Sequence, residues 1–487
     1  MNELLLGVLP VAGMGLAACL LFLLAIVVKN GRTMGVLGLL SFALLGGGPV
    51  ALLWSQGGKV VPQALLSSDT LALFFDALFV LAAIFTAALS LDYFAKKGVQ
   101  GSELYGLVAV AVAGMMVLAS ATNLVTFYLG LETMSIAFYV LAGFLRTQEN
   151  SVEASLKYFL LGAFSSAFLL FGAALLYGSA GSLDYGGLAA ALGSGAYGLG
   201  EPLLMLGFFL FLVGLFFKLS LIPFHFWAPD VYQGSPTPVT ALMAVGGKTA
   251  AAAGAIRIFL SAFGSSEMLS QKWMLLFVTV GLVTIFVGSM VAITQRQMKR
   301  LLAYSSIVHA GFIALGLAAL AVPALRQAML QAVVFYLAAY LFMNIGAFTV
   351  ASVVERPGSY DEPLSSYAGL GTSSPYLAAL FSLFMFSLAG IPLTVGFLGK
   401  LYVFKVLVNG GLYLYASLGL VGAVIATYYY LKVVVALYFP AEGEETVPKP
   451  AMGWASFATL TVMALATLIL GIFPGFLNDL IAGLSLG

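Results

Sequence analysis

The sequence is poor in charged residues, cysteine and histidine, and each shortage excludes a class of protein. Only 8% of its 487 residues are charged, against roughly 25% in a soluble domain. Its one cysteine, Cys19, excludes an internal disulfide, Cys-rich iron–sulfur ligation and zinc-finger spacing. The net charge of +1 and the absence of a Lys/Arg cluster give no indication of a nucleic-acid partner. The two histidines lie in such different contexts that haem ligation by both is not expected.

Apolar sequence is what the chain has in abundance. Hydrophobic residues make up 62% of it, in runs long enough to cross a hydrocarbon core of ~30 Å. The alternation typical of barrel strands is absent, so we predict an all-α polytopic membrane protein. The N-terminal stretch MNELLLGVLP is acidic and leads into a long apolar run, which indicates a retained first helix rather than a signal peptide. Fourteen spans are expected, near residues 4–28, 34–54, 70–94, 103–120, 123–145, 154–178, 202–227, 236–262, 273–294, 300–320, 325–353, 375–408, 411–438 and 452–476.

Positive charge in the loops predicts the orientation in the membrane, because cytoplasmic loops carry an excess of Lys and Arg. The loops after odd-numbered spans hold Lys29, Arg32, Lys96, Lys97, Arg146, Arg296, Lys299, Arg300, Arg356 and Lys449. The opposite loops hold only Lys59, Lys272 and Arg326. The first set is therefore predicted to be cytoplasmic. With an even number of spans, both termini are expected on the outer, periplasmic side.

Two expected spans, the seventh and the twelfth, carry similar interruptions. SLIPFHF covers residues 220–226 and SLAGIPLTVGF covers 387–397, with Pro223 and Pro392 169 residues apart. Proline breaks or kinks a helix, and Gly390 adds to the second break. Because the repeat length of five helices is odd, the second unit must be inverted relative to the first. We expect helices 1–3 in residues 1–102, inverted five-helix repeats in 103–262 and 273–438, and a last helix in 452–476.

Five ionisable residues are expected near the middle of the membrane, each in a different helix. At a rise of ~1.5 Å per residue, they are Glu132, Lys218, Lys248, His309 and Lys400. Such a charge can form a structural pair, but ionisable groups at this depth commonly mark proton or ion paths. Three other cations, Lys157, Arg257 and Lys432, lie within a few turns of a helix end. Their long side chains are expected to snorkel to the interface.

The pattern favours protons over a carried solute. A lysine taken out of water loses its proton more readily, and a nearby carboxylate opposes that effect. Moving a carboxylate such as Glu132 would therefore switch a lysine between holding and releasing a proton. Lys218 lies beside a helix break because unwound backbone can hold water and polar groups inside a membrane. His225, two residues beyond Pro223, is either a point where protons come in from the cytoplasm or a helix-end residue at the interface.

Five stretches carry a resemblance to a known family: GLETMSIAFYVLAGF, SVEASLKYF, FKLSLIPFHFWAPDVYQGSPTPVTA, KRLLAYSSIVHAGF and SLAGIPLTVGFLGKLYVF. Over essentially its whole length the chain resembles the antiporter-like subunits of proton-pumping NADH:quinone oxidoreductase, respiratory complex I. Val231, Tyr232 and Gln233 stand where the sister subunits and Mrp-type antiporters usually carry an Ala-His pattern. This variant is typical of the subunit N branch, the counterpart of the mitochondrial subunit ND-two.

The resemblance implies roles for individual residues. Glu132 and Lys218 match the essential Glu–Lys pair of the family, and Lys248 matches its central lysine. Lys400 matches the ionisable residue of helix twelve, and His309 falls between the last two. Lys157 matches a lysine found in subunit N, and we include Lys432 with it as a secondary relay residue.

The resemblance also implies partners and cofactors. No prosthetic group or metal is expected in this chain, because NADH, FMN, the iron–sulfur clusters and quinone belong to other subunits. The expected partners are the sister antiporter-like subunits, small membrane subunits and the lipid bilayer of the bacterial inner membrane. Three alternatives stay open: a subunit of a multi-chain cation/proton antiporter, a ferredoxin- or hydrogenase-linked relative, and a structural membrane scaffold.

Overall fold

The computed structural model describes residues 7–58, 65–195, 200–439 and 448–486. Within these ranges the chain forms helices and only isolated β-bridges, which confirms the predicted all-α class. Twelve helices are long and apolar enough to cross a membrane, and two shorter apolar helices, Leu104–Ser120 and Pro375–Ala389, complete the predicted fourteen. Lys59 and residues 4–6 of the first predicted span lie outside the described residues.

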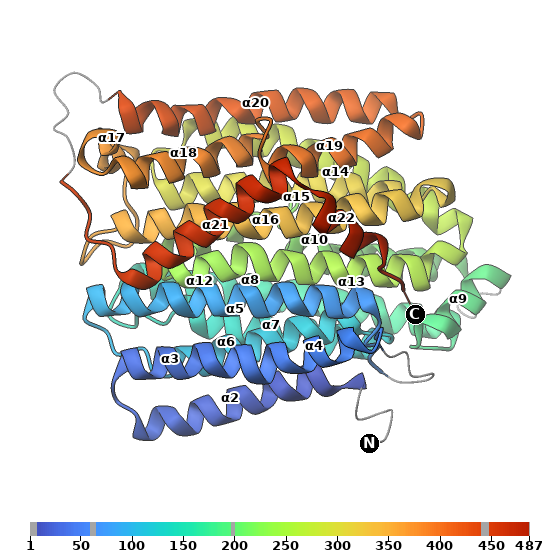
Figure 1. Ribbon diagram of the computed structural model, residues 1–487. Coiled ribbons are helices and arrows are strands. Elements are labelled where there is room, and N and C mark those ends of the chain that lie inside the picture. Colours follow the sequence, from blue (N-terminus) through green and yellow to red (C-terminus); the bar gives the residue numbers. More distant parts are fainter. Residues whose placement is uncertain (1–6, 59–64, 196–199, 440–447, 487) are drawn as a thin grey trace.

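The long helices lie side by side in one bundle (Figure 1). They are α2 (Leu9–Val27), the continuous α3–η1–α4 (Gly31–Ser41, Phe42–Gly47, Gly48–Ser55), α5 (Thr70–Lys97), α6 (Leu104–Ser120), α7 (Leu124–Ala142), α8 (Glu149–Ala180), α10 (Glu201–Leu219), the continuous α12–η2–α13 (Thr237–Leu242, Met243–Gly247, Lys248–Ser261), α14 (Glu267–Thr294), α15 (Met298–Ala319), α16 (Arg326–Val354), α18 (Pro375–Ala389), α19 (Val395–Asn409), α20 (Tyr413–Tyr438) and α21 (Trp454–Ile472). The short elements are α9 (Tyr185–Ser194), α11 (Trp227–Gly234), η3 (Phe263–Ser265), η4 (Pro323–Leu325), η5 (Leu364–Tyr367), α17 (Leu370–Ser373) and α22 (Gly475–Ala482). Helix α21 crosses the bundle obliquely and packs against α16 (Figure 1).

Both helix breaks occur where the sequence places them. Helix α10 ends at Leu219, and Ser220 takes a left-handed conformation with φ 59° before α11 begins. Helix α18 ends at Ala389, and Gly390 has φ 89° before α19 begins. The left-handed residue ends the helical hydrogen bonding in each case, and Pro223 and Pro392 then lie in the non-helical segments.

Helix α12–η2–α13 contains a feature that the sequence did not predict. Its central five residues, Met243–Gly247, form a π-helix inside an otherwise α-helical span. A π segment accommodates one extra residue per turn and is common at functional sites. Lys248 is the first residue after it.

Burial separates the helices into two groups. The most apolar windows of α12–η2–α13, α15 and α16 are 100%, 94% and 94% buried, whereas that of α2 is 33% and that of α20 is 39% buried. The peripheral helices therefore present apolar faces to their surroundings, while the three central helices are enclosed by protein. Two of these central helices carry Lys248 and His309.

The two ends of the described chain lie at the same end of the bundle. Ser68 donates a hydrogen bond to the carbonyl of Gly7, and the backbone N–H of Ser485 donates to Thr70 Oγ1 at 2.9 Å. Both contacts are made at the start of α5. We call this the outer end and the opposite end, where α5 finishes at Lys97, the inner end.

Candidate functional site

Lys248 is held at the centre of the bundle by hydroxyl groups. Its Nζ donates to Ser306 Oγ on α15, and Tyr340 on α16 donates to the same oxygen at 2.8 Å. The Nζ also lies 5.8 Å from the ring centre of Tyr232, an arrangement that favours a cation. The lysine is 1% exposed, so these groups and not solvent determine the state of its amine.

His309 continues this polar line. Its Nδ1 lies 2.6 Å from Tyr336 Oη, and its Nε2 lies 3.1 Å from Tyr430 Oη. Its ring centre is 5.1 Å from that of Tyr340. Lys400 and Lys248 are both close enough to act on His309 electrostatically. An imidazole bonded through both nitrogens can accept a proton on one and release a proton from the other.

Lys400 is held by backbone that the second helix break sets free. Its Nζ donates to the carbonyls of Leu388 and Ala389, each at 2.8 Å. These carbonyls belong to the last turn of α18, where no following helical N–H satisfies them. Gly390 is required here for two reasons: its φ is +89°, and a Cβ would lie 3.0 Å from Lys400 Cδ.

Lys218 sits in an aromatic box beside the first break. Its Nζ lies 5.2, 5.5 and 5.7 Å from the ring centres of Tyr158, Tyr139 and Phe217. Within the described part of the chain this nitrogen has no hydrogen-bond partner. Trp227, the first residue of α11, stacks on Tyr158 at 4.4 Å. The segment beyond the break therefore holds one wall of the box in place.

Glu132 and Lys218 do not touch. Glu132 Oε1 accepts a hydrogen bond from Ser166 on α8, and among the described residues no ion pair joins the two. Glu132 is nevertheless close enough to act on Lys218 electrostatically. In this structure, Glu132 therefore acts on Lys218 over a distance while its carboxylate is bonded to Ser166.

The remaining predicted residues lie nearer the inner end. His225 is 9% exposed, and its Nδ1 has no hydrogen-bond partner in the described chain. Lys157 pairs with Glu153 at 2.7 Å and with Asp230 at 2.8 Å. Neither Glu153 nor Asp230 is a hydrogen-bond partner of Lys248 or His309.

The other two cations assigned to snorkelling are both held by groups of the protein. Lys432 Nζ donates to the carbonyls of Ile293 and Gln295 at 3.2 and 3.3 Å, and so caps the end of α14. Arg257 is 2% exposed and forms two hydrogen bonds with Asp69, at 2.7 and 2.8 Å. For Arg257 the snorkelling prediction is wrong, because its guanidinium is buried in an ion pair with Asp69.

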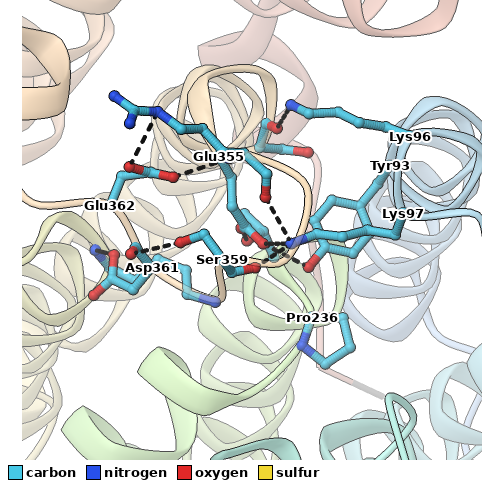
Figure 2. Close-up of polar contacts among 12 residues, drawn as sticks. Tyr93, Lys96, Lys97, Pro236, Glu355, Ser359, Asp361 and Glu362 are labelled. Carbon is cyan, nitrogen blue, oxygen red and sulfur yellow. Dashed lines mark hydrogen bonds and ion pairs between the residues drawn. The ribbon is translucent and has the colours of Figure 1, made fainter. Parts of the chain in front are cut away.

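A buried cluster at the inner end was missed altogether (Figure 2). Glu355, just beyond α16, pairs with Lys97 at 2.7 Å and accepts hydrogen bonds from Tyr93 and Thr237. Burial alone would raise the pKa of Glu355, but Lys299 and Lys97 outweigh it and hold this pKa below its usual value. Four separate segments contribute to this Glu355 cluster: α5, the start of α12, the start of α15 and the end of α16. No local sequence signal could therefore have revealed it.

The neighbouring carboxyl of Asp361 supplies a pH-dependent prediction. Its Oδ1 accepts from the backbone N–H of Lys299 at 3.0 Å, whereas its Oδ2 is buried without a partner among the described residues. Burial raises the pKa of Asp361 to about 6, although Lys299 opposes the shift and Glu355 adds to it. The folded protein therefore binds this proton more tightly than the unfolded chain, so stability falls as pH rises from about 4 to about 6.

We expect Asp361→Asn to remove this loss of folding stability with rising pH. The variant should be more stable than the wild type above pH 6, by roughly 2–3 kcal/mol, and equal to it near pH 4. Thermal unfolding of the detergent-purified protein across this pH range measures the difference. The assignment is wrong if both proteins show the same pH dependence.

The described residues contain no group of three or more His, Cys, Asp or Glu side chains placed to hold a metal ion. The buried groups described above, around Lys248, His309 and Lys400, are instead amines, an imidazole and hydroxyls. What they define is a polytopic membrane protein with buried ionisable groups in its interior.

Comparisons with known proteins agree with this class. Residues 121–426 match the family described as NADH:quinone oxidoreductase/Mrp antiporter, transmembrane. The chain is 44% identical to NADH-quinone oxidoreductase subunit N of Thermobifida fusca over 78% of its own length and 68% of the relative's. It is 39% identical to subunit N 2 of Roseiflexus castenholzii over 96% and 94% of the two lengths.

A solved structure gives the same result. A chain of respiratory complex I from Thermus thermophilus superposes with a TM-score of 0.79 and 35% identity, covering 98% of this chain and 100% of that one. The chain belongs to the subunit N family of NADH-quinone oxidoreductase.

Proposed function

We propose that this chain moves protons along its line of buried ionisable groups, as a membrane subunit of a proton-pumping NADH-quinone oxidoreductase. The observation that carries the proposal is that Lys248 and Tyr340 both donate to Ser306, while the ring of Tyr340 packs 5.1 Å from that of His309, which is itself bonded to two further tyrosine hydroxyls. Hydroxyl groups both donate and accept hydrogen bonds, so they can pass a proton between an amine and an imidazole.

The Glu132–Lys218 pair is the proposed input from the rest of the complex. With Glu132 bonded to Ser166, Lys218 is left in its aromatic box without a hydrogen-bond acceptor. Movement of Glu132 towards Lys218 would stabilise the ammonium form, and movement away would favour proton release. Lys400 is the proposed terminal group, since the carbonyls of the second break can hold its ammonium form.

Three residues receive secondary roles in this proposal. His225 is a point of proton uptake beyond the first break, supported by its buried Nδ1 without a partner among the described residues. Lys157 and Lys432 lie at the inner boundary and supply positive charge near it.

Redox chemistry is assigned to partner subunits. NADH, FMN, iron–sulfur clusters and quinone would be bound there, and this chain would contact sister antiporter-like subunits and small membrane subunits. We place the protein in the bacterial inner membrane with both termini on the periplasmic side. The shared outer end of residues 7 and 485 supports an even number of crossings.

The division into repeats also belongs to the proposal. Residues 103–262 and 273–438 would form the inverted units, flanked by residues 1–102 and 452–476. Corresponding helices pack alike, because α6 packs on α7 as α14 packs on α15. In the same way α8 packs on α10, and α16 on α18 and α19.

The test is Lys218→Ala in the assembled complex. We expect NADH-driven proton uptake by sealed inverted vesicles to fall at least fivefold and quinone reduction to fall with it, because the coupled lysine is missing. A native gel checks assembly, and Lys272→Ala, an exposed lysine, is the matched control. Normal uptake and normal quinone reduction in Lys218→Ala would remove Lys218 from the coupling machinery.

A further inference from the structure

Helix α5 carries a buried carboxyl group that the proposed proton line does not use. Asp76 is 3% exposed, and its Oδ1 has no hydrogen-bond partner in the described part of the chain. No ion pair joins Asp76 to another described residue. Ionisable residues inside a membrane domain are rare and expensive, and they commonly mark proton paths.

The position of Asp76 follows from its spacing to Asp69. Asp69 is the N-cap of α5, and Asp76 lies roughly two turns further along the same helix. Asp69 binds Arg257 of α13 through two hydrogen bonds, and Arg257 also acts on Asp76 electrostatically. Asp76 therefore faces α13 at a depth roughly 10 Å inside the Asp69–Arg257 pair.

Lys248 lies on the same side of the molecule. It precedes Arg257 on α13 by nine residues, or roughly 13 Å along the helix. Since α5 and α13 run antiparallel between the outer and inner ends, Asp76 lies in depth between Arg257 and Lys248. The four residues of α13 between Thr249 and Gly254 are all alanine, so no long side chain of α13 stands along this boundary.

A purely structural role for Asp76 is poorly supported by its contacts. The guanidinium of Arg257 already donates to Asp69 through Nη1 and Nη2, and its Nε donates to the carbonyl of Ala119 at 2.8 Å. A second carboxyl group is therefore not needed to neutralise this arginine. The hydroxyls of Thr249 on α13 and of Tyr185 are likewise buried without a partner among the described residues, and Tyr185 also lies within electrostatic range of Arg257.

We propose that Asp76 is a proton-carrying residue of a second branch, which leads from Lys248 to the outer end along the α5–α13 boundary. The ammonium of Lys248 would give up a proton and become an amine, and the carboxylate of Asp76 would receive it as a carboxylic acid. Release would follow beside the Asp69–Arg257 pair, where Ser67 donates to Asp69 at 3.0 Å. This inference rests on the proposed function of Lys248.

The test compares two substitutions in the assembled complex. Asp76→Asn keeps the size and polarity of the side chain but cannot hold a proton, whereas Asp76→Glu keeps the carboxyl group. We expect Asp76→Asn to lower the protons taken up per NADH oxidised at least twofold, and Asp76→Glu to restore more than half of the loss. Asp479→Asn, an exposed aspartate at the outer end, is the control.

The outcomes separate the inference from the function on which it rests. An unchanged ratio in Asp76→Asn, alongside loss of uptake in Lys248→Ala, overturns the Asp76 branch and leaves the main line in place. Normal uptake in Lys248→Ala overturns the main line itself. If both Asp76 variants lose assembled complex on a native gel and the remaining complex pumps normally, Asp76 is structural and the branch is wrong.

Discussion

Lys248→Ala is expected to reduce NADH-driven proton uptake in sealed inverted vesicles at least tenfold, with the complex still assembled. The lysine's neighbours Ser306, Tyr340 and Tyr232 carry hydroxyl groups, which are neutral near pH 7 and are much weaker bases than an amine. Removing the amine leaves these hydroxyls with nothing that can take up and hold a proton at neutral pH.

Lys248→Arg separates charge from proton exchange. Arginine keeps the positive charge but cannot give up its proton, so we expect it to be nearly as inactive as alanine. If arginine pumps as well as lysine, Lys248 acts through its charge alone. If alanine pumps normally, the central relay is wrong.

The second large effect concerns assembly. Arg257→Leu removes one partner of the buried Asp69–Arg257 pair, and with it the two hydrogen bonds that the guanidinium donates to Asp69. Breaking such a pair costs about 3–5 kcal/mol. We expect less than a fifth of the wild-type amount of complex on a native gel.

The double variant Asp69→Asn/Arg257→Leu is the matched control. Asparagine can still accept the hydrogen bond from Ala72 N–H that begins α5 at 2.8 Å, and its side chain carries no charge. At least half of the lost complex should return. Equal losses in the single and double variants would show that the pair contributes through its hydrogen bonds rather than through charge compensation.

Helix count, both breaks and the central lysines could be predicted because each has a local sequence signal. Apolar length predicts a span, and Pro or Gly within it predicts a break. The side-chain partners could not be predicted in the same way. Asp69 and Arg257 are 188 residues apart, and only the packing of α5 against α13 brings them together.

The hydrogen bond between Ser166 and Glu132 could not be predicted from the sequence either. A glutamate and a lysine in neighbouring helices suggest a salt bridge, but Ser166 competes for the carboxylate. The aromatic box competes for the ammonium. Which contact forms depends on differences of a few kcal/mol between alternatives, and a sequence pattern does not report such differences.

The π segment of the central helix has a mechanical consequence. Thr237 fixes the inner end of that helix through Glu355, and Arg257 fixes its outer end through Asp69. A π segment can advance along a helix by exchanging hydrogen-bond partners one at a time, and only the residues it passes change direction. If Met243–Gly247 gave up its extra residue to the turn beyond it, Lys248 would rotate by about 100° while both ends stayed in place. Such a shift would reorient the central lysine while both ends of its helix stay anchored.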